Sequence, residues 1–521
     1  MKRLVVVALL LVSLADFVSA LVVSNPNDPI YTQLDLWQGR GLISHLPPLR
    51  PYPIQLIRTL LEEVDRTGTP ADRWTAQSYL KQMTGFLNAH PELTHRSQTD
   101  FNHYYSRSGL NLNVNGTLGK LTTMSLRASL LLVTEPYGSL FPAYTRDSRD
   151  ILSDWSDLPL LGIDFHVRQS YFGGIAVGND RTYFQAGLMR SSYGPFFEDG
   201  AVLSPFAPEG GHMSFTWREK SFTYTMLFDE LVATDSTGAG VFPGKYLALH
   251  SVDVYPTSWL TLGAIETVIW GGRFEPLYLL PLTEYYYSQG ILGFPDNSML
   301  GLSGSIRLPY SLEADGLLYI DDINFDQLVT FHFNTKYKVA LQAGLKWTPS
   351  DLGLLSRVKL GYLMVTPYTY THEQFTALTN PNWQNYTNQG QLLGSSLPPD
   401  SDRLSLEVLT RPLPALQVSL FARMIRHGNA SEGIAGGGNG SIYDTGFVNG
   451  VPTFQNETRF LTQADIERTY QAGVSADYTF DTGFGTFNGT GSYTYQYVKN
   501  ANLVPTDTSN GFLSVGLRFA F

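Results

Sequence analysis

From about residue 101 onward, apolar and polar residues alternate along many segments of the chain. In residues 124–132 every second position is apolar, and Ser125, Arg127 and Ser129 lie between them. The same alternation recurs in residues 337–347, 403–408, 416–424 and 470–480. Alternating residues point to opposite faces of a strand. Repeated over one long chain, the pattern predicts an all-β fold, a transmembrane antiparallel β-barrel of about 18 strands, with 16 possible. Residues 165–177 are read as one long strand or two.

The connections between these segments alternate in length. Short turns at 349–353, 412–414 and 481–483 interleave with long segments near 191–210, 271–297, 367–401 and 426–466. This arrangement is typical of barrels with periplasmic turns on one side and extracellular loops on the other. We expect residues 271–297 to plug the lumen, and we expect the long loops to share the outward end.

The C-terminal segment is the clearest single strand. Leu513, Val515, Leu517, Phe519 and Phe521 fall on one face, and smaller or polar residues fall on the other. A lipid-facing strand needs this pattern. The terminal aromatic residue also resembles the signal by which the barrel assembly machinery recognises bacterial outer-membrane barrels. Phe519 and Phe521 are therefore the expected membrane-assembly signal.

The N-terminal residues are of a different kind. Residues 1–20 combine Lys2 and Arg3, an apolar run and Val18-Ser19-Ala20, which predicts a cleaved signal peptide. Residues 21–100 have helical spacing of apolar positions and an N-terminal cap at Thr69. We therefore expect a small periplasmic α-helical domain over 21–100, docked on the periplasmic mouth of a barrel over 101–521.

Composition agrees with a barrel. Aromatic residues make up 13% of the chain, with 30 Tyr and 30 Phe, and barrels use such residues in their interfacial girdles. The mean hydropathy of -0.09 fits walls of which only one face meets lipid. The net charge of -11 argues against a nucleic-acid partner. We expect the bacterial cell outer membrane as the location, its lipid as a partner, and a monomer.

Motifs for catalysis are missing from the sequence. Neither HExxH nor GxSxG occurs, and no nucleophile with a base stands out, so an outer-membrane lipase or protease ranks last among the functions. No cofactor is expected. The histidines have no metal-ligand spacing. A calcium site formed by Asp315, Asp321, Asp322 and Asp326 is conceivable, although a solvated loop rim is the commoner meaning of such a cluster.

Basic residues fall on the inferred lumen faces: Arg127, Arg168, Arg357, Lys359, Arg403 and Arg423. Guanidinium groups suit carboxylate or phosphate ligands, because they stay charged and make paired hydrogen bonds. The other interpretation is that they pair with Asp164, Glu407 and Asp477 and fill the lumen. The sequence leaves both open.

Several short segments resemble the capsule-assembly Wzi family of outer-membrane proteins. They are Asn27-Asp-Pro-Ile-Tyr31, Leu34, Gly41-Leu-Ile43, Arg50-Pro-Tyr52, Glu266-Thr-Val-Ile-Trp-Gly-Gly-Arg273, Tyr278-Leu-Leu-Pro281 and Tyr319-Ile-Asp-Asp322. The resemblance implies an 18-stranded barrel with an N-terminal helical bundle. It also implies an outer-membrane lectin that anchors exported capsular polysaccharide to the cell surface.

Aromatic residues of the long loops are the candidates for contact with such a polysaccharide: Tyr285, Tyr286, Tyr287, Tyr368, Tyr370, Trp383 and Tyr386. Sugar rings stack their apolar faces on aromatic rings, and their hydroxyls need amide partners such as Asn380, Asn382, Asn385 and Asn388. The alternative function is an outer-membrane porin or uptake channel for small, possibly anionic, solutes, which the basic lumen faces favour.

Overall fold

The computed structural model describes residues 25–521, apart from 84–86, 135–140, 146–155, 161–162, 198, 236–237, 323–337, 350–353, 372–381, 414, 430–446, 449–450, 453–459 and 483. The expected signal peptide lies outside the described residues. In the part of the chain that is described, no helix combines the length and the apolar character needed to cross a bilayer.

Three helices follow the N-terminus: α2 (Pro29–Gly39), α3 (Ile54–Thr67) and α4 (Pro70–Gln82). The expected cap at Thr69 is present, because its hydroxyl accepts the Asp72 amide and the Asp72 carboxylate accepts the Thr69 amide. Helix α3 buries one apolar stripe, including Ile57, Leu61 and Val64. Such short helices depend on packing for their stability.

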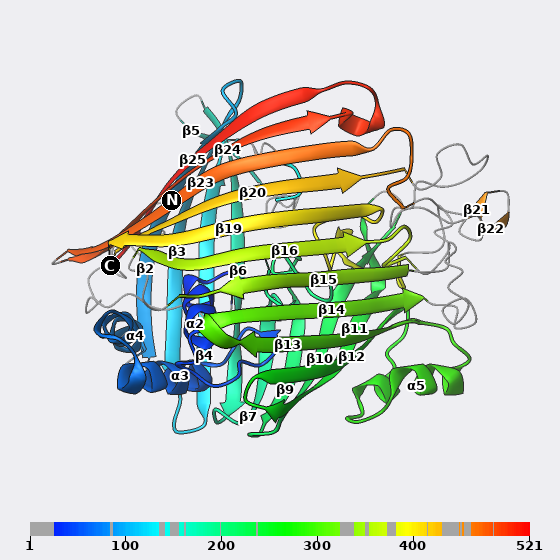
Figure 1. The fold of residues 1–521 in the computed structure, drawn as a ribbon, viewed down its shortest axis with the longest axis horizontal. Coiled ribbons are helices and arrows are strands. Elements are labelled where there is room, and N and C mark those ends of the chain that lie inside the picture. Colours follow the sequence, from blue (N-terminus) through cyan, green and yellow to red (C-terminus); the bar gives the residue numbers. More distant parts are fainter. Residues whose placement is uncertain are drawn as a thin grey trace.

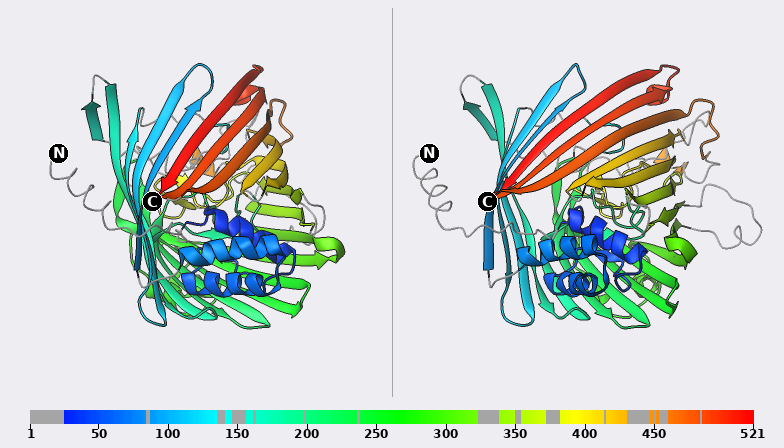
Figure 2. Two further views of the ribbon diagram at one scale, coloured as in Figure 1. Left: turned by 90° about the vertical axis from the view of Figure 1, so that its left-hand side faces the viewer. Right: turned by 60° about the vertical axis from the view of Figure 1, so that its left-hand side comes forward.

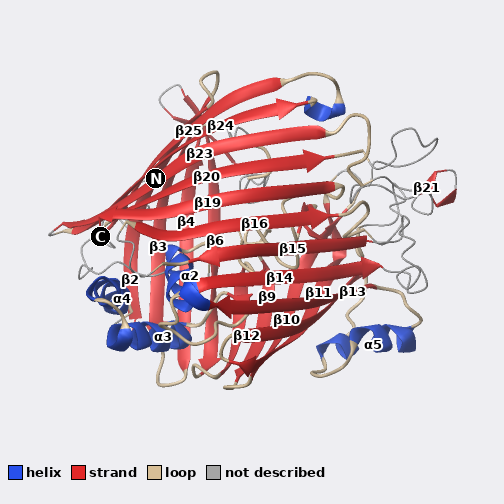
Figure 3. Cartoon of the chain, viewed as in Figure 1, coloured by secondary structure: helices blue, strands red, loops and turns tan. Residues whose placement is uncertain are grey.

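Within the described residues, 18 strands form the closed antiparallel barrel that the alternation predicted (Figures 1 and 3). They are β2 (Leu87–Thr99), β3 (Tyr104–Thr117), β4 (Thr122–Val133), β6 (Ile163–Gly178), β7 (Thr182–Met189), β9 (Gly210–Arg218), β10 (Phe222–Thr234), β11 (Gly240–Thr257), β12 (Leu260–Gly271), β13 (Asn297–Leu308), β14 (Leu312–Asp322), β15 (Lys338–Trp347), β16 (Leu355–Val365), β19 (Ser401–Leu413), β20 (Leu416–His427), β23 (Glu467–Thr482), β24 (Gly485–Lys499) and β25 (Thr508–Ala520).

The strands follow one another around the barrel, and β25 closes it by pairing with β2, with Leu93 opposite Phe519. Residues 165–177 belong to one long strand, β6. A short strand, β5 (Ser156–Leu160), pairs with β6 beside the wall. Smaller elements lie in the connections: β1 (Leu49–Arg50), β8 (Ser192–Tyr193), β17 (Thr387–Asn388), β18 (Gln391–Leu392), β21 (Phe447–Val448), β22 (Val451–Pro452), η2 (Pro276–Leu279), α5 (Tyr285–Leu292), η3 (Pro309–Ser311) and η5 (Ala501–Leu503).

The two faces of the wall have opposite chemistry. Outward positions expose a belt of apolar side chains, among them Leu126, Leu302, Leu345, Leu404 and Val515. Exposed aromatic residues lie at the short-turn end: Trp217, Trp259, Tyr310 and Phe484. An apolar belt bordered by aromatic residues is the surface that a bilayer requires. The chain is an outer-membrane β-barrel whose outer face contacts lipid.

The barrel begins earlier in the chain than the boundary expected at residue 101. Strand β2 begins at Leu87, and its whole length pairs with β3, from Leu87 opposite Gly116 to Thr99 opposite Tyr104. The alternation is weak in the sequence because His95 and Ser97 take outward positions that apolar residues occupy elsewhere in the wall. The Glu92 side chain is buried in the lumen, where the Arg127 guanidinium lies 2.7 Å from it.

The helices lie at the end of the barrel that carries the short turns, in blue in Figure 2. The Gln55 side chain donates to the carbonyl of Leu121 in the β3–β4 turn, and Arg218 donates to the carbonyl of His45. Tyr183 of β7 belongs to the same apolar cluster as the helices. The helical segment therefore docks on the short-turn mouth, and the long connections lie at the opposite end.

Candidate functional site: a plugged lumen and its outer cavity

Two long connections fold into the lumen and pack against the wall. We call residues 191–207 and 382–400 the plug. The plug packs on inward-facing wall residues in one apolar cluster, which includes Leu203 and Leu397 of the plug with Leu249, Ile265 and Leu363 of the wall. The lumen of the barrel is filled by its own chain at this level.

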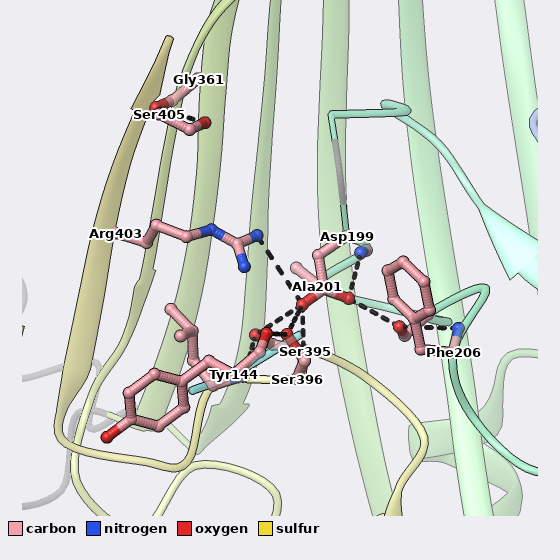
Figure 4. A network of polar contacts seen from close by, with 12 residues as sticks. Tyr144, Asp199, Ala201, Phe206, Gly361, Ser395, Ser396, Arg403 and Ser405 are labelled. Carbon is pink, nitrogen blue, oxygen red and sulfur yellow. Dashed lines mark hydrogen bonds and ion pairs between the residues drawn. The ribbon is translucent and has the colours of Figure 1, made fainter. Parts of the chain in front are cut away.

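Asp199 is the polar centre of the plug (Figure 4). Its carboxylate accepts hydrogen bonds from the Ser204 hydroxyl at 2.6 Å and from the Ser396 amide at 2.6 Å. The Arg403 guanidinium of β19 lies 3.7 Å from the same carboxylate, and both side chains are buried. This carboxylate thus joins the two plug segments to each other and to the wall.

Three of the seven predicted sugar-contacting aromatic residues are buried in or beside the plug. Tyr368, Tyr370 and Tyr386 are fully buried. The Tyr370 and Tyr386 rings stack with centroids 5.5 Å apart, and the Tyr370 hydroxyl donates to the Ala201 carbonyl at 2.6 Å. The structure therefore brings these two residues together, and they pack against the plug.

The beginning of the 382–400 plug segment also contacts the barrel wall. The Trp383 ring lies against Gly271 and Gly272, where an added Cβ would meet the indole. The buried Lys245 ammonium donates to the carbonyls of Asn382 and Asn385, at 2.6 and 2.5 Å. Asn380 lies outside the described residues. The Asn382 side chain is hydrogen-bonded to Thr234, and the Asn388 side chain accepts the Val232 amide and donates to the Glu209 carbonyl. These two side-chain amides proposed for sugar hydroxyls are therefore used within the protein.

Residues 271–297 do not plug the lumen, contrary to expectation. The segment turns outward and packs on the outer wall, where Tyr278 and Tyr285 join a cluster with Phe228, Val268 and Trp270. Tyr285 is buried there, whereas Tyr286 and Tyr287 are exposed. The periodicity of the sequence gives no sign of which side of the wall a long connection covers.

The six basic residues predicted for the lumen all lie on inward faces, and several have acidic partners. Arg357 and Lys359 share Glu407, at 2.9 and 3.5 Å, and Arg127 pairs with Glu92. Arg423 donates to Gln471, and Arg168 is buried. Asp477 instead accepts from Asn488, and the side chain of Asp164 lies outside the described residues. Glu407 thus fulfils the expected lumen-filling role.

A cavity of about 550 Å³ opens above the plug at the outer mouth, and we call it the outer cavity. It is lined by Ala143, Tyr144, His427, Glu467, Val498, Ala501, Asn502, Leu503 and Thr508. The Tyr144 hydroxyl donates to one Glu467 oxygen at 3.0 Å, and the Asn502 amide donates to the other at 2.8 Å. The Ser396 hydroxyl donates to the Tyr144 carbonyl, which connects cavity and plug.

Sequence reasoning missed the outer cavity. Tyr144 comes from the β4–β5 connection, and Glu467 begins β23 more than 300 residues later, so no local pattern joins them. The signal that was available is the position of Glu467, a carboxylate on the inward face at the outer end of a strand. A second, smaller cavity of about 110 Å³ lies on the side of the helices, beside Asp253, Arg307 and Lys346.

Two of the four aspartates considered for calcium have partners within the protein. Asp315 lies 2.9 Å from the Lys346 ammonium, and Asp321 accepts the Tyr370 amide. Asp326 and the side chain of Asp322 lie outside the described residues. Among the residues described, no group of three or more ligating side chains is arranged to hold a metal ion. The expectation that the chain is not an enzyme stays a prediction.

Comparisons with known proteins bear on the fold. No family model and no curated protein sequence matches the chain. The solved structure of Wzi from Escherichia coli, titled an outer membrane protein involved in group 1 capsule assembly and a carbohydrate binding β-barrel, is similar with a TM-score of 0.58. The likeness covers 97% of this chain and 99% of that chain, at 12% identity.

Porin-like barrels are more distant. Pseudomonas aeruginosa OccK10 (OpdN) gives a TM-score of 0.43 at 10% identity, covering 84% of this chain and 99% of that one. Acinetobacter baumannii OccAB4 gives 0.42 at 10% identity, again covering 84% and 99%. The expected resemblance to Wzi is therefore confirmed for the fold. At 12% sequence identity, the comparison shows nothing beyond the fold.

Proposed function

We propose that this protein binds surface polysaccharide at the outer mouth of an occluded outer-membrane barrel. The observation that carries the proposal is the plug, in which Asp199 ties both lumen segments to Arg403 of the wall. A barrel closed in this way offers its outer mouth for binding rather than a path for transport. The fold likeness to Wzi, titled a carbohydrate binding β-barrel, supports the same function.

The lining of the outer cavity suits a neutral sugar. Tyr144 supplies an aromatic ring and a hydroxyl, and Asn502 and Thr508 supply further polar groups. Glu467 contributes a carboxylate, and no lysine or arginine is among the lining residues that the structure describes. A uronic acid or a sialic acid would bring a second negative charge beside Glu467. Neutral hexoses or amino sugars are therefore the favoured ligands.

Binding by purified protein in detergent tests the proposal. The probes are neutral and acidic polysaccharides of defined composition together with surface polysaccharide extracted from the source bacterium, measured by biolayer interferometry. Tyr144→Ala and Glu467→Gln are expected to weaken binding of neutral polysaccharide by about tenfold, a typical cost of losing one directed hydrogen bond. Tyr286→Ala, on the outer wall, is the matched control. Equal binding by all three variants would place the glycan elsewhere.

The basic lumen residues favour a second candidate function, an anion-selective channel. Their acidic partners oppose it, because Glu407 already compensates Arg357 and Lys359. Reconstitution into a planar bilayer separates the two functions. We expect little or no conductance from the native barrel, whereas large, stable, anion-selective steps would replace the binding function with the channel.

A further inference from the structure

The segment 272–296 covers a polar patch on the lipid-facing wall. On β11 and β12, His250 and Glu266 are paired across the strands and point outward, in line with the apolar belt. The Glu266 carboxylate accepts the Tyr285 amide at 2.9 Å. The His250 ring stacks on Tyr285 with centroids 4.4 Å apart, and its Nδ1 lies 3.2 Å from the Thr283 carbonyl.

The patch lies at a depth where the bilayer is apolar. Glu266 is six residues along β12 from Leu260, at the short-turn end beside Trp259. At about 3.3 Å per residue and a tilt of about 40°, that places Glu266 roughly 15 Å above the periplasmic interface, inside an apolar band about 25 Å tall. A carboxylate facing hydrocarbon is costly, so the wall needs a cover at this point.

The opposite face of the cover is apolar and exposed. Tyr286, Tyr287, Ile291 and Phe294 are 65%, 71%, 65% and 52% exposed, and no charged residue occurs from Tyr285 to Phe294. Helix α5 lies beside the outer end of the wall in Figure 1. Its exposed face borders the belt, where the neighbouring β13 exposes Leu300 and Leu302.

We infer that residues 272–296 form a lipid-contacting element of the outer leaflet, in which Tyr286, Tyr287, Ile291 and Phe294 contact acyl chains and the headgroup boundary. Continuity with the belt argues for lipid as the occupant, because the same bilayer must cover both surfaces. Tyrosine and aliphatic side chains without charge suit that boundary. The inference is independent of the glycan function, since it concerns the outer wall alone.

Site-directed spin labelling tests this inference directly, because the chain contains no cysteine and a single introduced cysteine labels one position. The probes are Tyr287→Cys and Ile291→Cys, with Tyr286→Cys as a second position on α5. Leu302→Cys on the belt is the lipid control, and Lys120→Cys in the β3–β4 turn is the water control. Each labelled barrel is reconstituted into phosphatidylethanolamine–phosphatidylglycerol bilayers and checked for heat-modifiable mobility.

Power-saturation spectra then compare collisions with oxygen, which concentrates in lipid, and with a nickel chelate, which stays in water. The α5 labels are expected to match Leu302→Cys, with oxygen collisions several-fold above those at Lys120→Cys. Nickel accessibility like that at Lys120→Cys would overturn the inference by placing α5 in water. Immobilised labels that neither reagent reaches would also overturn it, because the face would then be covered by a second copy or another protein.

Discussion

At the scale of single residues, buried carboxylates hold the irregular parts of this protein together. Asp199 joins two plug segments to β19, and Glu407 joins two cations of β16. A buried ion is stabilising only when its partners are in place, and removal of one partner leaves the other charge in a poor environment. Substitution of Asp199 is therefore expected to act on the plug, whereas substitution of Glu407 is expected to act on the wall between β16 and β19.

Asp199→Ala is expected to destabilise the plug by about 3 kcal/mol, the usual scale for breaking a buried ion pair. Asp199→Asn should lie between native and alanine variants, because the amide oxygen still accepts from Ser204. Planar-bilayer conductance and thermal unfolding in detergent measure the effect. Asp477→Ala, which removes a lumen carboxylate bonded to Asn488, is the control. A closed, native-like Asp199→Ala barrel would contradict the central role of this residue.

Asp400 gives the outer mouth a pH dependence. Its buried carboxylate accepts the Leu461 amide at 3.3 Å and the Gln463 side chain at 2.8 Å, which ties two outer connections together. Burial raises the pKa of Asp400 from 3.8 to about 7. Because the folded form holds its proton more tightly, this contact is most stable below about pH 4 and weakens as the pH rises through 7.

Amide hydrogen exchange at Leu461 checks this expectation. After correction for intrinsic exchange with a strand amide such as Ala422, protection at Leu461 should fall at least about tenfold between pH 4 and pH 8. In Asp400→Asn the carboxylate is replaced by a neutral amide of similar shape, so the protection should become independent of pH. A native protein without any pH trend would show that Asp400 does not control this contact.

At the scale of elements, the sequence predicts those parts whose environment is local. Strands β4, β15 and β25 were recognisable because one face of each meets lipid and the other meets the lumen, which imposes a period of two. The cap at Thr69 was recognisable because Asp72 completes it within the same turn. Strand β2 was missed because His95 and Ser97 are polar residues at outward positions, so the alternation covers only its first half.

The candidate site was largely beyond sequence reasoning, for a physical reason. Asp199 meets Ser396 and Arg403 only because two connections about 200 residues apart enter the same lumen. Tyr370 and Tyr386 are of the residue type that stacks on sugar rings, yet both are buried in or beside the plug. Composition indicates which residues suit a ligand, whereas solvent exposure is decided by long-range packing.

Residues 272–296, which cover Glu266 on the outer wall, provide a prediction at the scale of elements. Tyr285→Ala removes the ring that stacks on His250 and loosens the segment that caps Glu266, so the barrel in a bilayer should unfold at a lower temperature. The same substitution in a Glu266→Leu background should cost clearly less, because no carboxylate then needs a cover. Tyr287→Ala, on the exposed face, is the control. Equal losses in both backgrounds would mean that Tyr285 acts by packing alone.

At the scale of the whole molecule, the barrel depends on one closing seam. The last strand, β25, must pair with the first, β2, although almost the whole chain separates them in sequence. At this seam the Phe521 amide donates to the Pro91 carbonyl at 3.2 Å. Aromatic rings gather beside this seam at the short-turn end. The Phe519 ring stacks on Phe487 at 4.2 Å, and Phe521 meets Phe519 edge to face at 4.6 Å.

Packing and assembly make opposite predictions for these two rings. Phe519 has the larger set of ring contacts, so if the cluster matters only for packing, Phe519→Ala should reduce stability and outer-membrane level more than Phe521→Ala does. If the terminal ring is read by the barrel assembly machinery, Phe521→Ala should lower the heat-modifiable, membrane-inserted fraction several-fold more than Phe519→Ala. Refolding of both purified variants into detergent, without the machinery, supplies the control. An assembly signal predicts that Phe521→Ala refolds like the native chain in detergent and fails only in the cell, whereas a defect of equal size in both settings would reduce Phe521 to a packing residue.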